Sequence, residues 1–233
     1  AMSRGVSRSA GTFLNKLILN AVPGARMLQY HGHLCDLPEQ FSDLPVIGFV
    51  RNPWDWYVSM FFDYRRKQQY VYRVLSEGSS LGFDATVARF LQLGDGSEES
   101  RRRLDQLARV APMRIETNRP PRNHLPGLTS HDFANYGENV GYYSWLFRLM
   151  FETDRQHRLL IGRFENVRSE ALRLLEETGT PITAGISDYL ENSQRLNASS
   201  RPRNYASRYT PELAELVAVN DRHIIDRFGY SLA

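Results

Sequence analysis

The chain has 233 residues, 42% of them hydrophobic and 24% charged, and a formal net charge of +3. This composition is typical of a soluble globular protein with one substantial core. No apolar run approaches the roughly 20 residues of a membrane span, and a lone cysteine, Cys35, excludes an internal disulfide. The first residues, AMSRGVSRSAG, contain no apolar stretch, so we expect no secretory signal and a cytoplasmic location.

The apolar pattern of the first third of the chain predicts two strands and two helices. A helical face over 12–22 ends at Pro23-Gly24, because neither residue continues a helix readily. Residues 26–30 then predict a short strand and residues 45–51 a buried one. A long aromatic helix is expected over 55–75, after Asn52 and Pro53 break the strand.

Strands continue to alternate with helices in the remainder. This alternation predicts an α/β fold, a single domain over 1–233 with a central, mostly parallel sheet flanked by helices. The expected elements are helices over 83–93 and 98–110, an irregular loop over 113–133, a helix over 141–152, a strand over 157–165, a helix over 167–179 closed by Gly179, and a C-terminal helix over 211–230 with Pro211 in its first turn.

Small residues precede the first predicted helix, in the stretch GVSRSAGTFL from Gly5 to Leu14. A loop of this kind offers backbone N–H groups and the positive end of a helix dipole, which suit phosphate. Arg8 adds charge, and Ser9 and Thr12 add hydroxyls. Because Ala10-Gly11-Thr12 stands where a Walker loop needs Gly-Lys-Ser/Thr, hydrolysis of a metal-bound triphosphate is disfavoured.

Arg51 lies at the end of the strand over 45–51, and Ser59 lies about two turns into the helix that follows. In open α/β sheets, ligands bind beyond the carboxyl ends of the strands. A guanidinium and a hydroxyl there are suited to hold one more phosphate group, at about 1.5–3 kcal/mol for each charge-assisted hydrogen bond. The alternative is that Arg51 only caps the strand and that Ser59 is a serine buried among aromatic residues.

Two histidines, His31 and His33, follow the strand over 26–30. A histidine can accept a proton from a hydroxyl near neutral pH, so either is a candidate general base. Together with Cys35 they also suggest zinc, but the H-x-H-x-C spacing is not a common zinc pattern and no second cysteine exists. We therefore expect no metal.

The chain resembles the sulfotransferases that use 3′-phosphoadenosine 5′-phosphosulfate (PAPS). The resemblance lies in the order of three features: the small-residue loop, the histidine, and Arg51 followed by Ser59 eight residues later. SRSAGTFL is similar to the family's PKSGTTWL-like loop, GHLCDLP to its THLPxxxLP, and VRNPWDWYVS closely to its xRNPxDxxxS. LIGRFENVRSEALRLLEETG and the C-terminal stretch from Tyr209 to Tyr230 are also similar to family segments. Residues from about 68 to 133 have no counterpart, and this is where the family varies its acceptor site.

The resemblance implies a P-loop-NTPase-like sulfotransferase fold and a role for each matching residue. Arg51 and Ser59 would hold the 3′-phosphate, while His33 would be the catalytic base that deprotonates the acceptor. Arg8 stands at the family's lysine; it can stabilise charge on the leaving oxygen but does not readily donate a proton. The nucleotide-binding residues implied in total are Arg8, Ser9, Ala10, Gly11, Thr12, Phe13, Arg51 and Ser59, with Phe13 at the aromatic position that stacks on adenine.

Several assignments stay open. The family's C-terminal Arg-Lys-Gly loop is absent, and Arg201, Arg203 or Arg208 in SSRPRNYASRY would substitute for it unless that loop is merely exposed. If His33 faces away from the site, His31, Asp36 or Glu39 would be the base. Seven arginines between Arg101 and Arg122 would recognise an anionic acceptor or form a solvated face. The aromatic residues of 54–62 and 142–145 would line an acceptor pocket or belong to the core.

The leading hypothesis is therefore in-line transfer of a sulfuryl group from PAPS to a hydroxyl, or an amine, of a small-molecule or carbohydrate acceptor. No metal, membrane or nucleic-acid partner is expected, and the oligomeric state is left open. A nucleotide-dependent kinase on a P-loop-like scaffold is one alternative, which the missing Gly-Lys-Ser/Thr disfavours. The other is a nucleic-acid binder, motivated by the arginine excess, since only Lys16 and Lys67 among 29 basic residues are lysines. A coding bias explains the excess equally well.

Overall fold

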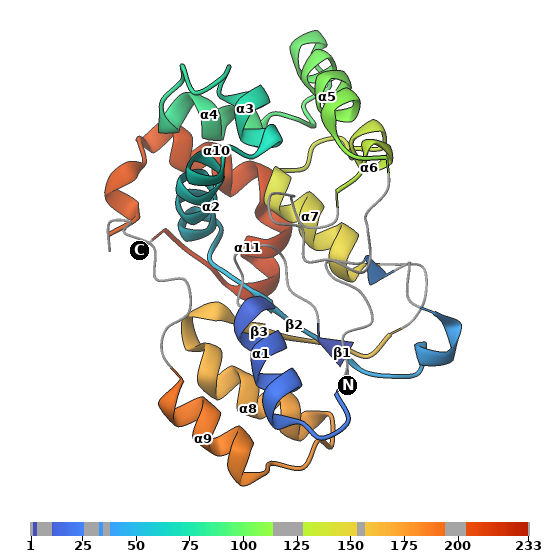
Figure 1. The fold of residues 1–233 in the computed structure, drawn as a ribbon. Coiled ribbons are helices and arrows are strands. Elements are labelled where there is room, and N and C mark those ends of the chain that lie inside the picture. Colours follow the sequence, from blue (N-terminus) through green and yellow to red (C-terminus); the bar gives the residue numbers. More distant parts are fainter. Residues whose placement is uncertain are drawn as a thin grey trace. The chain divides into compact units, whose positions relative to one another are not determined.

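The fold is α/β and mostly helical, with a small parallel sheet (Figure 1). The computed structural model describes residues 2–3, 11–25, 33–34, 38–113, 128–152, 157–193 and 204–232. Strands β1 (Met2–Ser3), β2 (Val46–Val50) and β3 (Leu159–Arg163) are parallel and lie in the order β1-β2-β3. The two predicted strands over 45–51 and 157–165 are confirmed, whereas the one over 26–30 lies outside the described residues.

The chain divides into two compact units, residues 1–51 with 148–198 and residues 52–147 with 199–233. The sheet belongs to the first unit. Helices α2 (Pro53–Lys67) and α10 (Pro211–Asn220) belong to the second. The single domain over 1–233, with an acceptor-site segment at about 68–133, stays a prediction. Among the described helices, none combines the length and the apolar character needed to cross a bilayer.

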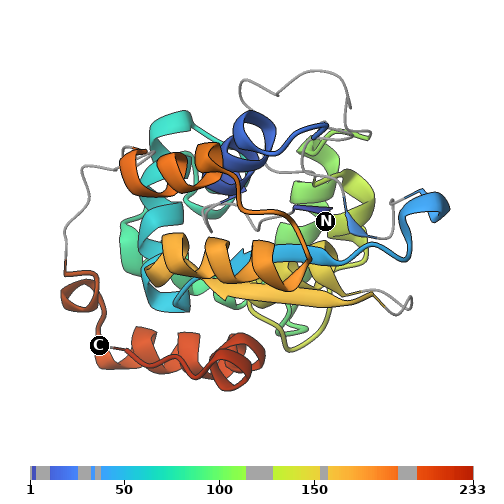
Figure 2. The same ribbon diagram turned by 90° about the horizontal axis from the view of Figure 1, so that it is seen from below.

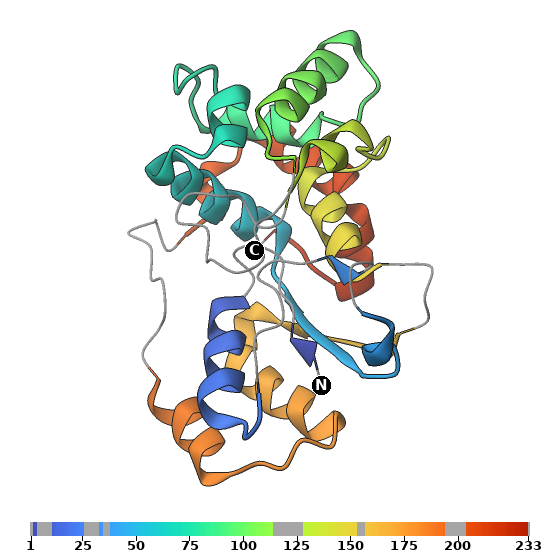
Figure 3. The same ribbon diagram turned by 45° about the vertical axis from the view of Figure 1, so that its right-hand side comes forward.

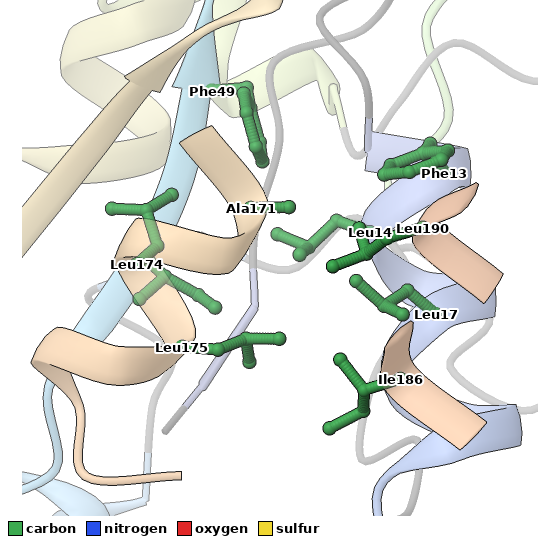
Figure 4. Packing of buried hydrophobic residues seen from close by; sticks show 10 residues of the cluster. Phe13, Leu14, Leu17, Phe49, Ala171, Leu174, Leu175, Ile186 and Leu190 are labelled. Atoms are coloured by element: carbon green, nitrogen blue, oxygen red, sulfur yellow. The ribbon is translucent and has the colours of Figure 1, made fainter. Parts of the chain in front are cut away.

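The core of the first unit lies between the sheet and three helices. Helices α1 (Gly11–Ala21), α8 (Val167–Glu177) and α9 (Ala184–Asn192) pack together on one side of β2; Figure 2 shows the three helices from below. Ile47 and Phe49 alternate along β2 and face this cluster, in which Leu14, Leu17, Leu174 and Ile186 are fully buried (Figure 4). The predicted helices over 12–22 and 167–179 are confirmed.

Helix α9 is not predicted from the sequence, and Arg168 explains much of its position. The guanidinium of Arg168 donates from Nη1 to the carbonyls of Leu190 (2.6 Å) and Glu191 (2.7 Å), and from Nη2 to that of Ser193. These are carbonyls of the last helical turn, which have no partner within the helix. A cation from α8 therefore holds the C-terminus of α9 against the rest of the unit.

The second unit is helical and has an aromatic core. Trp56 stacks on Tyr143, with ring centroids 4.3 Å apart and planes 13° from parallel. Its other described helices are α3 (Tyr70–Leu75), α4 (Phe83–Leu91), α5 (Glu98–Val110), α6 (Ser130–Ala134), α7 (Tyr142–Phe151) and α11 (Arg222–Phe228). The boundary between the two units falls within α7. Short 3₁₀ turns are η2 (Glu39–Phe41) and η3 (Phe164–Asn166) in the first unit and η4 (Ala206–Arg208) in the second.

Three predicted elements are corrected. The long helix over 55–75 breaks at Gln68, whose φ of 49° is left-handed, so that α2 and α3 are separate helices. The loop over 113–133 ends in helix α6, because the Thr129 and Asp132 side chains form a capping box. The C-terminal helix over 211–230 breaks at Asp221 into α10 and α11. The helices over 83–93, 98–110 and 141–152 are confirmed.

Asp221 breaks the C-terminal helix at the point where its carboxylate caps α7. The Ser144 amide donates to Asp221 Oδ1 at 2.8 Å, and the Tyr143 amide donates to the Tyr57 hydroxyl at 3.2 Å. Tyr57 also interacts with the Asp221 carboxylate, so two otherwise unsatisfied amides of the first turn of α7 end on neighbouring buried side chains. Gly141 leaves room for the carboxylate, since a Cβ there would lie 2.6 Å from Asp221 Oδ1.

Burial raises the pKa of Asp221 from 3.8 to about 6, although hydrogen bonds from Tyr57 and Ser144 oppose the shift. A raised pKa in the folded state means that the protonated carboxyl stabilises the fold below the unfolded pKa. That contribution is lost as the pH rises through about 6.

We therefore expect Asp221→Asn to gain stability relative to the parent protein as the pH rises, since the amide keeps an acceptor for Ser144 and cannot ionise. The gain between about pH 5 and about pH 7.5 should be about 1.4 kcal/mol. Urea unfolding of both proteins across this range measures it. A difference in unfolding free energy that stays constant with pH would contradict the assignment.

Candidate functional site

The carboxyl ends of the three parallel strands meet at one edge of the sheet in the first unit. β1 leads toward α1, which begins at Gly11, while Arg51 follows β2 and Phe164 follows β3. Ligands of open parallel sheets bind beyond this edge. Helix α1 begins at Gly11, one residue before the predicted start at Thr12, and Arg51 lies at a strand end as predicted.

Arg51 is buried, with 3% of its surface exposed, and its guanidinium carbon lies 4.5 Å from the centroid of the Phe164 ring. This contact follows from the register, because Val50 pairs with Arg163 and the next residue of each strand leaves the same edge. An aromatic face attracts a guanidinium through its quadrupole, and the five N–H donors of a guanidinium suit the oxygens of an oxyanion. The arrangement is suited to hold an oxyanion at the end of β2.

The turn from β2 into α2 follows the sequence prediction. Asn52 is the N-cap, since the Trp54 amide donates to its Oδ1 at 3.1 Å, and Pro53 occupies the first helical turn. The Asn52 side chain also donates to the Ser231 carbonyl at 2.8 Å. Ser59 is buried in α2, which belongs to the second unit, whereas Arg51 belongs to the first. Their joint action on one phosphate stays a prediction.

Phe13 and His33 are the other predicted site residues whose side chains are described. Phe13 is 9% exposed and packs in the core of the first unit, with its ring centroid 5.6 Å from that of Tyr189. Figure 4 shows it at the edge of that cluster, on α1. His33 is buried, with 8% of its surface exposed. Their roles in adenine stacking and proton transfer stay predictions.

Other predicted site residues lie outside the described part of the chain: Arg8, Ser9, Ala10, Arg201 and Arg203, together with the alternative bases His31 and Asp36. Glu39, the third alternative base, is exposed on η2. Arg208 is exposed, and its guanidinium carbon lies 5.5 Å from the Phe62 ring centroid.

The aromatic residues that the sequence offered as an acceptor pocket belong mainly to the core of the second unit. Seven of the eight are buried, and Phe62 is half-buried. Of the seven arginines in the segment after Ser100, four lie on α5 and three fall outside the described residues. Arg101, Arg102 and Arg109 are exposed on α5, whereas Arg103 is half-buried.

Sequence reasoning missed Phe164 as the partner of Arg51. The two residues are more than a hundred positions apart, and only the register of β2 against β3 brings them together. The predicted strand over 157–165 runs past Phe164 to Glu165, so the sequence pattern alone does not give this register. Comparison with protein-family models and with curated protein sequences gives no match for this chain.

We expect Arg51 and Phe164 to be energetically coupled. In a double-mutant cycle of Arg51→Met and Phe164→Leu, the coupling free energy should be about 0.5–2 kcal/mol, since a desolvated cation–π contact has that size. Denaturant unfolding of the parent, the two single variants and the double variant measures it. Strictly additive effects would contradict the contact.

Proposed function

We propose that the protein is a PAPS-dependent sulfotransferase that moves a sulfuryl group to an acceptor hydroxyl or amine. The observation that carries the proposal is Arg51, a buried guanidinium held over Phe164 at the carboxyl end of β2 and followed at once by the Asn52-capped helix that contains Ser59. The same residues form the VRNPWDWYVS motif, the most specific part of the sequence resemblance.

The residues at the edge of the sheet fit a nucleotide with separate phosphate groups. Arg51, with Ser59, would bind the 3′-phosphate through charge-assisted hydrogen bonds. Arg8, Thr12 and the N-terminus of α1 would neutralise the 5′ side. When bound, PAPS supplies an activated sulfuryl group on its 5′-phosphate. The chain's own contribution is to orient this end toward the acceptor and to stabilise charge on the leaving oxygen, the role assigned to Arg8.

His33 completes the proposal as the general base. It would accept the proton of the acceptor hydroxyl as the new oxygen–sulfur bond forms and the bond to the leaving phosphate oxygen breaks. His33 is buried, so water has little access to its ring. The proposed location is the cytoplasm, in keeping with a chain whose lone cysteine allows no internal disulfide.

We expect the parent protein to bind adenosine 3′,5′-bisphosphate more tightly than 5′-AMP or ATP, because Arg51 recognises the 3′-phosphate. Arg51→Ala should reduce bisphosphate affinity by roughly ten-fold or more and leave 5′-AMP affinity little changed. Calorimetric titration of both proteins with the three nucleotides measures this, and the fold of the variant is checked by its unfolding midpoint.

Equal affinity for the bisphosphate and 5′-AMP would overturn the proposed donor site. Magnesium-dependent binding and turnover of ATP would favour a kinase instead. Binding to single-stranded or duplex nucleic acid that weakens steeply with salt would favour a nucleic-acid binder. The three outcomes are distinguishable in the same series of titrations.

We expect His33→Ala to lose sulfuryl transfer by about 100-fold or more while it keeps bisphosphate affinity, since a general base contributes about 10²–10⁴-fold to rate. Transfer from radiolabelled PAPS to a panel of phenols, sugars and amines provides the measurement. His33→Gln serves as the matched variant of similar size. Turnover at the parent rate in either variant would exclude His33 as the base.

A further inference from the structure

A second cationic site lies among the helices of the second unit. α3 packs against both α4 and α5, in the upper part of Figure 3, and a cavity of about 310 Å³ lies against all three helices. This volume is at the lower end of the range for small-molecule sites. The polar side chains that line it are Arg73, Glu77, Arg89, Arg102, Arg103 and Gln106.

The charges around this pocket do not cancel. Arg89 pairs with Glu77 at 2.6 Å between Nη2 and Oε1. Arg102 and Arg103 share a single carboxylate oxygen, Glu99 Oε1, at 2.7 Å each. With Arg73, four guanidinium groups stand against the two carboxylates of these ion pairs and Asp95, whose negative charge also acts on Arg103, so positive charge remains in surplus at one small cavity.

The guanidinium groups of these arginines repel one another electrostatically. Only 12% of the Arg103 side chain and 20% of the Arg89 side chain are exposed. Burial lowers the pKa of Arg103, and the neighbouring Arg89 lowers it further, since a like charge disfavours the protonated form. An anion in the pocket would relieve this repulsion.

The wall of the pocket contains an unusual turn. Glu77, Gly78 and Ser79 all have left-handed backbone conformations, with φ values of 50°, 69° and 82°. Hydrogen bonds hold the turn in place: the Gly78 amide donates to the Arg73 carbonyl at 2.7 Å, and the Ser79 amide donates to Ser76 Oγ at 2.9 Å. Non-glycine residues in this region cost free energy, and such strain is found most often at functional sites. The turn fixes Glu77, and through it Arg89.

We propose that this pocket binds a small molecule that carries a phosphate ester. Arginine forks match the oxygens of a tetrahedral oxyanion, and a phosphate monoester, with between −1.5 and −2 charges near neutral pH, offsets the surplus positive charge more fully than a singly charged ester does. A sulfate ester, with one negative charge, would bind more weakly. The site goes beyond the proposed sulfotransferase activity, because it uses none of the residues assigned to the donor.

The test is calorimetric titration with glucose 6-phosphate, glucose 6-sulfate and glucose at about pH 7.5. We expect saturable binding of the phosphate ester, weaker binding of the sulfate ester and none of the uncharged sugar. The double variant Arg73→Gln/Arg102→Gln should lower glucose 6-phosphate affinity by about ten-fold or more. Both side chains are exposed, and equal unfolding midpoints verify that the variant is folded.

Arg101→Gln/Arg109→Gln is the matched control, because it removes the same charge from exposed positions of α5 that do not line the pocket. It should change the affinity by less than about two-fold, because neither side chain lines the pocket and salt screens charges that do not contact the bound anion. Arg51→Ala should bind glucose 6-phosphate like the parent, which separates this site from the proposed donor site. Absence of saturable binding to the parent, equal losses in the two double variants, or equal affinity for the two esters would each overturn the proposal.

Discussion

The parallel pairing of β2 with β3 determines where the candidate site lies. Phe49 pairs in register with Gly162, and a Cβ at Gly162 would come within 2.9 Å of the Phe49 ring and of the Glu170 side chain on α8. A slip by one residue would turn Ile47 and Phe49 away from the cluster with α1, α8 and α9. Gly162 therefore permits the register that the packing of Ile47 and Phe49 requires. The same register brings Arg51 against Phe164.

Helix ends in the second unit follow from the need to satisfy buried backbone groups. Asp221 ends α10 and supplies the acceptor for the Ser144 amide at the start of α7, so one side chain serves two elements. Burial raises its pKa to about 6, which makes the network sensitive to pH. A continuous helix over 211–230 would have satisfied its own backbone and left the first turn of α7 without this cap.

Local patterns predicted most of the elements. A long-range contact accounts for the missed break at Asp221, whereas helix α6 was missed although its capping box is local. Pro23-Gly24 and Gly179 could be predicted as helix ends, because proline and glycine interrupt a helix through their own backbone and need no distant partner. The break at Asp221 has no local cause, since its partner Ser144 lies 77 residues away. Arg51 could be placed at a strand end from its neighbours alone, but Phe164 could be assigned to it only through the strand register. The capping box of α6 was visible in the sequence as Thr129 followed by Asp132.

The preference for arginine over lysine has a structural reason at some positions and none at others. At Phe164, the guanidinium of Arg51 lies over an aromatic ring, and a planar guanidinium can stack on a ring face, whereas an ammonium has no such plane. In the pocket of α3, α4 and α5, Arg102 directs two nitrogens to one carboxylate, at 2.7 and 3.3 Å, while Arg103 contacts the same group. Lysine cannot make that bidentate pair.

At Arg101 and Arg109 the side chains are exposed and a lysine would serve as well, so a coding bias suffices there. The arginine excess is therefore informative only where a ring or a shared carboxylate fixes the guanidinium, and both proposed sites are such places.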